Sequence, residues 1–247
     1  MYAFPPIAAA VELTHTAVAG LAVLLAPVAG AAAAAAAVVC LTALVRIALL
    51  PLSVAQVRAE QTRARLAPRL RELQREHADD PQRLLTAQRE LYAAEGSSPL
   101  AGCLPTLAQL PVFAVLYGVF IGAGGGGDLL GATLGGAPLG SGLGDALASG
   151  EPARMLVFAV LLAVLAATAW ASRRFLTLPA MARAAEDGDP DAPATRVMAA
   201  MSYLSYTTVV FAAFVPLAAG LYLAATTAWT VAERLVLRRL VGAGGPA

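Results

Sequence analysis

Long apolar stretches, interrupted by short polar segments, account for most of the 247-residue sequence. A helix needs about 20 mainly apolar residues to cross a bilayer. The stretches that meet this requirement are residues 32–54, 104–122, 154–172 and 197–237. The last is too long for one crossing and contains Pro216, which divides it into residues 197–214 and 216–236. The pattern therefore predicts five transmembrane helices.

Residues 7–29 form a further apolar stretch directly before the first predicted span. The stretch contains three residues that are uncommon inside a membrane helix: Glu12, His15 and Pro27. It is either an interfacial helix that lies on the membrane or a sixth crossing. We assign residues 1–30 to an external interfacial helix, because a sixth crossing would disturb the arginine distribution of the chain.

The polar segments differ in arginine content, and this difference predicts their side of the membrane. Residues 55–101 hold eight arginines, residues 173–196 hold four and residues 234–239 hold three, whereas residues 1–30 and 123–153 hold none. Basic residues accumulate in cytoplasmic segments. Five crossings then place the N-terminus outside and the C-terminus in the cytoplasm, with a Gly-rich external loop at 123–153 and a cytosolic loop at 173–196.

The cytosolic segment 55–98, which follows the first span (31–54), has the pattern of a helical hairpin. Apolar and polar positions recur at spacings of four and three residues at Leu66, Leu70, Leu73 and His77, and again at Leu84, Gln88, Leu91 and Glu95. Asp80 and Pro81 supply an N-cap and a first-turn proline for the second helix, and Gly96 ends it. A solvated loop with some helical content is the alternative interpretation.

Composition supports a membrane protein. Hydrophobic residues make up 59% of the chain and charged residues 13%, about half the usual fraction of about 25%, and the mean hydropathy is +0.70. We therefore predict an all-α polytopic membrane protein in which residues 99–247 carry transmembrane helices two to five. All 17 basic residues are arginine, so a nucleotide-binding P-loop, which needs a lysine, is excluded. The glycine run at 122–127 is expected to be a flexible loop.

Arg46 lies inside the apolar run LVRIALLP of the first span. If that span ends at Val54, Arg46 lies roughly 12 Å along the helix from its end, at 1.5 Å per residue. Insertion scales assign such a charge about 2.5–3.5 kcal/mol at the membrane centre. Snorkelling, an ion pair or hydration could offset this cost, but the spans contain only one acidic residue, Glu233, near an inner end. The sequence therefore favours a hydrated cavity open to the cytosol.

Polar residues recur at helical spacing in several spans and predict the other walls of this cavity. The residues expected to line the cavity and contact a ligand are Arg46, Thr42, Gln109, Tyr203, Thr207, Tyr222, Thr226 and Thr230. Polar side chains in membrane helices often only form hydrogen bonds between neighbouring helices. The polar residues of any one span could therefore serve this purpose alone. Polar residues at helical spacing in several spans, together with an arginine that has no predicted ion-pair partner, favour one polar cavity lined by these spans.

The sequence shows no catalytic constellation. His15 and His77 fall on opposite sides of the predicted membrane, and no HExxH, GxSxG or acidic-pair motif is present. Two cysteines, Cys40 and Cys103, make no metal motif. We therefore expect a protein that is not an enzyme and has no catalytic residue, metal or cofactor.

Two segments resemble a known family of membrane proteins. They read VRIALLPLSVAQVRAEQTRARLAPRLRELQRE and EGSSPLAGCLPTLAQLPVFAVLYGVF. The residues that carry the resemblance are Arg46, Pro51-Leu52, Leu66-Ala67-Pro68, Gly102-Cys103-Leu104-Pro105 and Gln109-Leu110-Pro111. They are similar to the YidC/Oxa/Alb family of membrane protein insertases, in a short bacterial form.

The resemblance implies a five-span core with a hydrophilic groove that is closed on the outside and open to cytosol and lipid. Arg46 would contact the hydrophilic part of an arriving chain, and residues 7–29 would be the external amphipathic helix. The implied partners are nascent membrane proteins and the lipid bilayer of the plasma membrane, with the ribosome and the Sec translocon as further candidates and no nucleotide or DNA. The family's Pro-Ser-Gly at the start of the last span reads Pro216-Leu217-Ala218 here, so helix packing is expected to differ there.

Three functions fit these observations. The first is a membrane protein insertase and chaperone that uses a groove containing Arg46. The second is a small-solute or anion channel or transporter with Arg46 as the binding charge, although the chain shows no internal repeat of the kind that transporters often contain. The third is an assembly factor that keeps the fold without insertion activity.

Overall fold

The computed structural model describes residues 5–96, 115, 118–119, 127–185 and 202–242, which are mostly helical. The predictions for the second span, including Gln109, for Cys103 and for the glycine run before Gly127 lie outside these residues. The chain forms two compact units: Met1–Ala48 with Val112–Leu235, and Leu49–Pro111 with Val236–Ala247. Each unit is described by itself.

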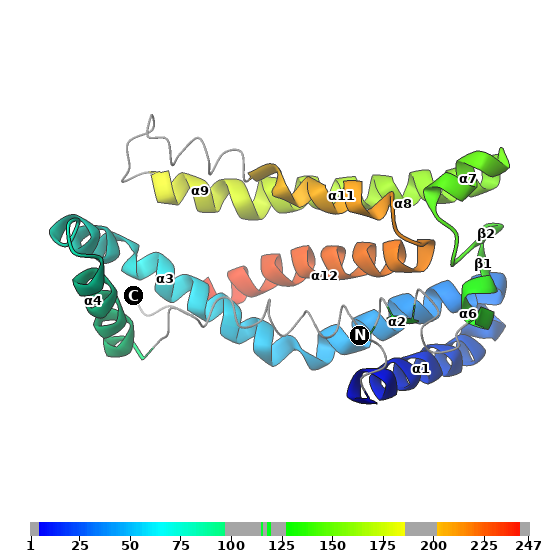
Figure 1. Cartoon of the computed structure of the whole chain (residues 1–247), viewed down its shortest axis with the longest axis horizontal. Coiled ribbons are helices and arrows are strands. Elements are labelled where there is room, and N and C mark those ends of the chain that lie inside the picture. Colours follow the sequence, from blue (N-terminus) through cyan, green and yellow to red (C-terminus); the bar gives the residue numbers. More distant parts are fainter. Residues whose placement is uncertain (1–4, 97–114, 116–117, 120–126, 186–201, 243–247) are drawn as a thin grey trace. The chain divides into compact units, whose positions relative to one another are not determined.

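The first unit begins with two helices that lie side by side (Figure 1). Helix α1 (Pro5–Ala29) is joined to α2 (Ala33–Ala48) by the 3-10 turn η1 (Gly30–Ala32), where Gly30 takes a positive φ of 53° that favours glycine. Val11 and Val18 of α1 are buried in the shared core. The outward side chains of α1 include apolar residues that are 72–90% exposed: Leu13, Val23, Leu24 and Val28. This apolar outer side suits contact with lipid, and whether α1 lies on or across the membrane stays a prediction.

Two helical stretches among the described residues are long and apolar enough to cross a membrane: Ile7–Ala48 and Pro152–Ala182. The second comprises α8 (Pro152–Ala171), a π-helical segment η3 (Ser172–Thr177) and the first turns of α9 (Leu178–Ala185). The 3-10 segment η4 (Ser202–Tyr206) and α11 (Thr207–Ala212) pack against α8. Helix α11 ends at Ala212, and α12 (Leu217–Gly242) begins directly after Pro216. The predicted interruption of the helix at Pro216 is therefore confirmed.

The external loop predicted at 123–153 instead contains regular structure over most of its length. It forms α6 (Gly127–Gly131), the antiparallel strands β1 (Thr133–Leu134) and β2 (Ala137–Pro138), and α7 (Leu143–Ser149). The segment is anchored because its apolar side chains enter the core, where Leu139 is 1% exposed. It also caps α12: the N–H groups of Leu217 and Ala218 donate to the carbonyl oxygens of Ser141 and Leu139, each at 2.9 Å. Two of the N–H groups that a helix start leaves unpaired are thereby satisfied.

Gly135, in the turn between β1 and β2, is expected to be intolerant of a side chain. Its φ is +56°, and an added Cβ would lie 2.8 Å from Cγ2 of Val157. We expect Gly135→Ala to lower the free energy of unfolding by about 1–3 kcal/mol through backbone strain and overlap. Thermal unfolding in detergent measures this, with Gly144→Ala as control, since nothing lies within 4 Å of its Cβ. Equal melting temperatures for the two variants would contradict the prediction.

The second unit contains α3 (Leu50–Glu76) and α4 (Pro81–Ala94), joined by residues 77–80. The carboxylate of Asp80 caps α4 by accepting the N–H groups of Gln82 and Arg83 at 3.1 and 3.0 Å, as its sequence position predicts. Arg65 of α3 also contacts Glu95, just after α4, at 3.5 Å. Helix α3 starts at Leu50 rather than after Val54, because Pro51 fits the first turn of a helix.

Buried side chains of α8 and α12 form part of the first unit's core, together with those of α1 and α2. Phe158 and Leu165 of α8 and Leu217 of α12 are at most 1% exposed. Gly220 of α12 lets the Leu161 side chain of α8 approach the α12 backbone closely, since an added Cβ at Gly220 would lie 2.6 Å from Cδ2 of Leu161. This glycine lies shortly after Pro216-Leu217-Ala218, so close packing at the start of the last helix occurs here without the Pro-Ser-Gly sequence.

Candidate functional site: a hydroxyl-lined cavity around Arg46

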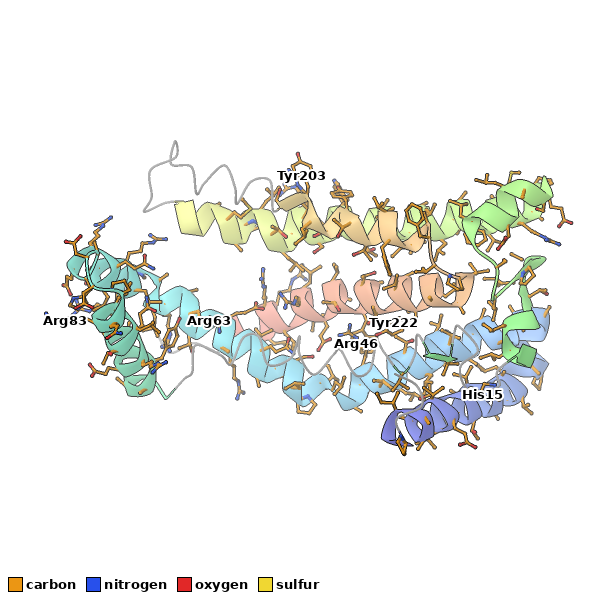
Figure 2. The ribbon with its side chains drawn as sticks, in the orientation of Figure 1. His15, Arg46, Arg63, Arg83, Tyr203 and Tyr222 are labelled. Carbon is orange, nitrogen blue, oxygen red and sulfur yellow. The ribbon has the colours of Figure 1, made fainter. Side chains whose placement is uncertain are left out.

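Arg46 lies in the last turn of α2 and reaches α12. Its Nε donates to Oγ1 of Thr226 at 3.0 Å, and its Nη2 donates to the same oxygen at 2.5 Å and to the Thr226 carbonyl oxygen at 3.3 Å. Figure 2 shows Arg46 and Tyr222 between the ribbons of α2 and α12. One edge of the guanidinium is therefore held by a single threonine.

The hydrogen-bond partners of Arg46 are neutral oxygens, the hydroxyl and carbonyl oxygens of Thr226. Among the described residues, Arg46 forms no ion pair with a carboxylate. A charge without a direct counter-ion in an apolar helix bundle needs polar surroundings or water to offset its desolvation.

A cavity of about 220 Å³ adjoins Arg46 within the first unit. Its polar lining consists of Arg46 and seven hydroxyl-bearing residues from four segments of the chain. The hydroxyl residues are Thr168 and Ser172 at the end of α8, Ser205 and Thr208 at η4 and α11, and Thr226, Thr227 and Thr230 on α12. Apolar side chains such as Leu165 and Val231 complete the wall. The cavity has room and polar partners for more than one water molecule.

Of the residues predicted from the sequence, Arg46, Thr226 and Thr230 line this cavity. Thr42 does not: it is 6% exposed and donates to the Val38 carbonyl oxygen at 2.7 Å. Tyr222 does not line the cavity either: it is 5% exposed and belongs to the apolar core of the first unit. Gln109 lies outside the described residues.

Tyr203 and Thr207 lie on the outer surface of their segment rather than in the cavity lining. Tyr203 is 58% exposed, and the Arg173 guanidinium lies 4.2 Å from the centre of its ring. Thr207 is exposed and donates to the Leu204 carbonyl oxygen at 2.7 Å. Residues 202–206 form a 3-10 helix with three residues per turn. Ser205 and Thr208, three residues apart, line the cavity instead.

Sequence reasoning missed five hydroxyl-bearing lining residues: Thr168, Ser172, Ser205, Thr208 and Thr227. Thr168 and Ser172 are four residues apart near the end of the apolar stretch 154–172, so the helical spacing used for the other stretches could have found them. Ser205 and Thr208 are three residues apart, a spacing that also shares one face of an α-helix, so the same criterion applies to them.

Apolar helices of membrane-spanning length around a polar cavity define a helical membrane protein. A model of the family described as the 60Kd inner membrane protein matches residues 25–243. The chain belongs to this family. Most of α1 precedes the matched region.

Curated relatives match a shorter region. The chain is 42% identical over 85 residues to the membrane protein insertase YidC of Methylobacillus flagellatus and 42% identical over 83 residues to that of Azotobacter vinelandii. It is 47% identical over 79 residues to the inner membrane ALBINO3-like protein 2, chloroplastic, of Chlamydomonas reinhardtii. These alignments cover 32–34% of the chain and 15–19% of each relative. The names of the two bacterial relatives describe membrane protein insertases and not enzymes, in agreement with the sequence interpretation.

Proposed function

We propose that this protein is a membrane protein insertase that helps nascent chains enter and fold in the bilayer. The observation that carries the proposal is Arg46, held by Thr226 against a hydroxyl-lined cavity inside an apolar helical unit. The names of the relatives, which are membrane protein insertases, support the same activity.

The cavity would act by lowering a desolvation barrier. Moving a polar group from water into hydrocarbon without a hydrogen bond costs several kcal/mol, about 2–7 depending on the reference. A client segment that passes beside Arg46 and the cavity threonines would keep hydrogen-bond partners on its way. The burial of the client's apolar segment in lipid then supplies the driving force, and no nucleotide is needed.

The proposed setting is the bacterial plasma membrane, with five spans, the N-terminus outside and the C-terminus in the cytoplasm. The arginine distribution supports this orientation. Helices α3 and α4 would then form a cytosolic hairpin, which is the part of the chain accessible to a ribosome or a Sec translocon. The nascent client is the partner on which the proposal depends.

Adjacent threonines of α11 provide a test by photo-crosslinking. Thr208 lines the cavity and Thr207 is exposed outside it. We expect a photo-reactive residue at 208 to capture a nascent membrane protein, with at least several-fold weaker capture from 207, because crosslinkers react only with groups in contact. The adducts are measured by gel mobility after translation with inverted vesicles. Equal capture from both positions would argue against passage beside the cavity, and no adducts at either would contradict the proposed function.

A further inference from the structure

Two adjacent arginines follow the end of α8, where the π-helical segment η3 begins. Arg173 and Arg174 come directly after the 20 residues of α8 and the first residue of η3. At 1.5 Å per residue α8 is about 30 Å long, which matches the hydrocarbon thickness of a bilayer. The ion pair of Arg154 with Glu151 lies at the start of the same helix. Charged groups therefore lie at both ends of α8, about one hydrocarbon thickness apart, at the depth of the lipid headgroups.

The guanidinium of Arg173 is held in one orientation by two neighbours. Its Nε donates to Oγ of Ser202 at 3.2 Å, and Ser202 is only 2% exposed. Its Cζ lies 4.2 Å from the centre of the Tyr203 ring, which is within the range of a cation–π contact. A side chain that is already ordered in this way loses less conformational entropy when it binds a ligand.

Both Nη groups of Arg173 are left for an anion. Within the part of the chain that the structure describes, the bond to Ser202 is the only hydrogen bond of this side chain, and no carboxylate pairs with it. Arg174 also has no carboxylate partner among these residues, and its Cζ lies 6.0 Å from the centre of the Phe175 ring. The two Nη groups of an arginine form a fork that fits two oxygens of a phosphate group.

Exposed aromatic and apolar side chains surround the two arginines. Trp170 and Phe175 are 54% and 46% exposed and meet edge to face, with ring centres 5.9 Å apart. Tyr203 is 58% exposed, its ring centre lies 6.3 Å from that of Tyr206, and Leu204 beside it is 60% exposed. Tryptophan and tyrosine are enriched at the interface between membrane and water. A lipid covers both the charged and the apolar side chains of such a patch, whereas an RNA or an acidic protein matches only the charge.

We propose that Arg173, together with Arg174 and Tyr203, binds the headgroup phosphate of an anionic phospholipid. The acyl chains of this lipid lie along the outer side of α11, where Val210 and Phe211 are 63% and 48% exposed. The two arginines bring two positive charges, so an anionic headgroup is favoured over a zwitterionic one. The arginine distribution of the chain assigns the site to the cytoplasmic leaflet.

This lipid site is separate from the cavity around Arg46. Ser172, the first residue of η3, lines the cavity, whereas its neighbour Arg173 does not. π-Helical turns are rare and occur frequently at functional sites, and here one such segment contributes to two sites. The ligand is a component of the membrane rather than a client chain, so the inference goes beyond the proposed insertase function and does not depend on it.

The test measures lipid binding to the full chain in detergent. Dioctanoyl phosphatidylglycerol is titrated into the protein, with dioctanoyl phosphatidylcholine as the zwitterionic comparison. Binding is followed by the rise in melting temperature and by native mass spectrometry of the protein–lipid complex. We expect phosphatidylglycerol to bind several-fold more tightly than phosphatidylcholine. Arg173→Gln should weaken its binding by about tenfold, because the charged donor to the phosphate is lost.

Arg154→Gln is the matched control, since it removes the same charge where the arginine is already paired with Glu151, and it should bind phosphatidylglycerol as the unmodified protein does. Tyr203→Leu changes an exposed residue outside the core and should weaken binding by about twofold to fivefold through the lost cation–π contact. Melting temperatures without lipid verify that each variant is folded.

Four results would overturn the inference. The first is equal binding of the two lipids, and the second is unchanged phosphatidylglycerol binding in both Arg173→Gln and Tyr203→Leu. The third is an equal loss of binding in Arg154→Gln and Arg173→Gln. The fourth is a rise in melting temperature with inorganic phosphate or a single-stranded RNA oligomer that matches the rise with phosphatidylglycerol, because the ligand would then not be a lipid.

Discussion

Arg46→Ala is expected to reduce insertion of a single-span client into proteoliposomes by about tenfold to a hundredfold. The variant loses the charged donor that lines the cavity, and hydrogen bonds from a charged group contribute about 1.5–3 kcal/mol each, where 1.4 kcal/mol is a factor of ten. Arg46→Lys keeps the charge but cannot hold Thr226 through two nitrogens. It should retain an intermediate activity.

Arg154→Ala is the matched control for this experiment. Arg154 lies in the first turn of α8, at the opposite end of that helix from the cavity residue Thr168, and contacts Glu151 at 2.7 Å. Its loss should leave insertion unchanged within about twofold, because Arg154 does not line the cavity. Complementation of insertase-depleted cells gives a second measurement. Full growth with Arg46→Ala would contradict a role for the arginine, and failure of the unmodified protein would favour an assembly factor without insertion activity.

Charge and periodicity in the sequence were sufficient to select Arg46 as the centre of the site. A charge in an apolar run is costly, so its presence alone indicates polar surroundings. Thr226 and Thr230 followed from their four-residue spacing on one long helix. What the sequence could not supply is the hydrogen bonding of Arg46 to Thr226, because this depends on how α2 and α12 approach each other.

Tyr203 and Thr207 show where helical periodicity fails. Both were placed on a cavity face by assuming α-helical winding, but residues 202–206 wind as a 3-10 helix. A local change from 3.6 to three residues per turn rotates the following side chains. Hydrophobic patterns carry no signal for this change, so the orientation of Tyr203 could not be predicted. Thr207 lies in α11, where its neighbour Thr208 lines the cavity.

The segment between Gly127 and Ser149 shows a limit of composition. Its many glycines indicate a flexible loop, yet the structure places two strands and two short helices there. The order comes from long-range contacts: Leu139 enters the core and carbonyl groups of the segment cap α12. Composition describes only local preferences, and tertiary contacts override them here.

Gly220→Leu is expected to prevent accumulation of folded protein. An added Cβ would lie 2.6 Å from Cδ2 of Leu161, below the 3.0 Å that real Cβ atoms keep, and Leu161 is itself only 6% exposed. Because Leu161 is buried, its side chain has little free space into which it can move. Overpacking by a single methyl group costs about 1–3 kcal/mol, and leucine adds several more atoms at the closest contact of α8 with α12. Gly20→Leu is the control, because nothing lies within 4 Å of its Cβ.

The measurement is the yield of monodisperse protein in detergent together with its melting temperature. Gly220→Ala alone should lower the free energy of unfolding by about 1–3 kcal/mol, and Leu161→Ala alone should lower it through the cavity that it leaves. Combined, the two changes relieve each other, because the new methyl group fills space that the leucine vacates. The double variant should therefore be more stable than the sum of the single effects predicts. Strict additivity, or an unchanged melting temperature in Gly220→Leu, would show that α8 and α12 are not in close contact at this point.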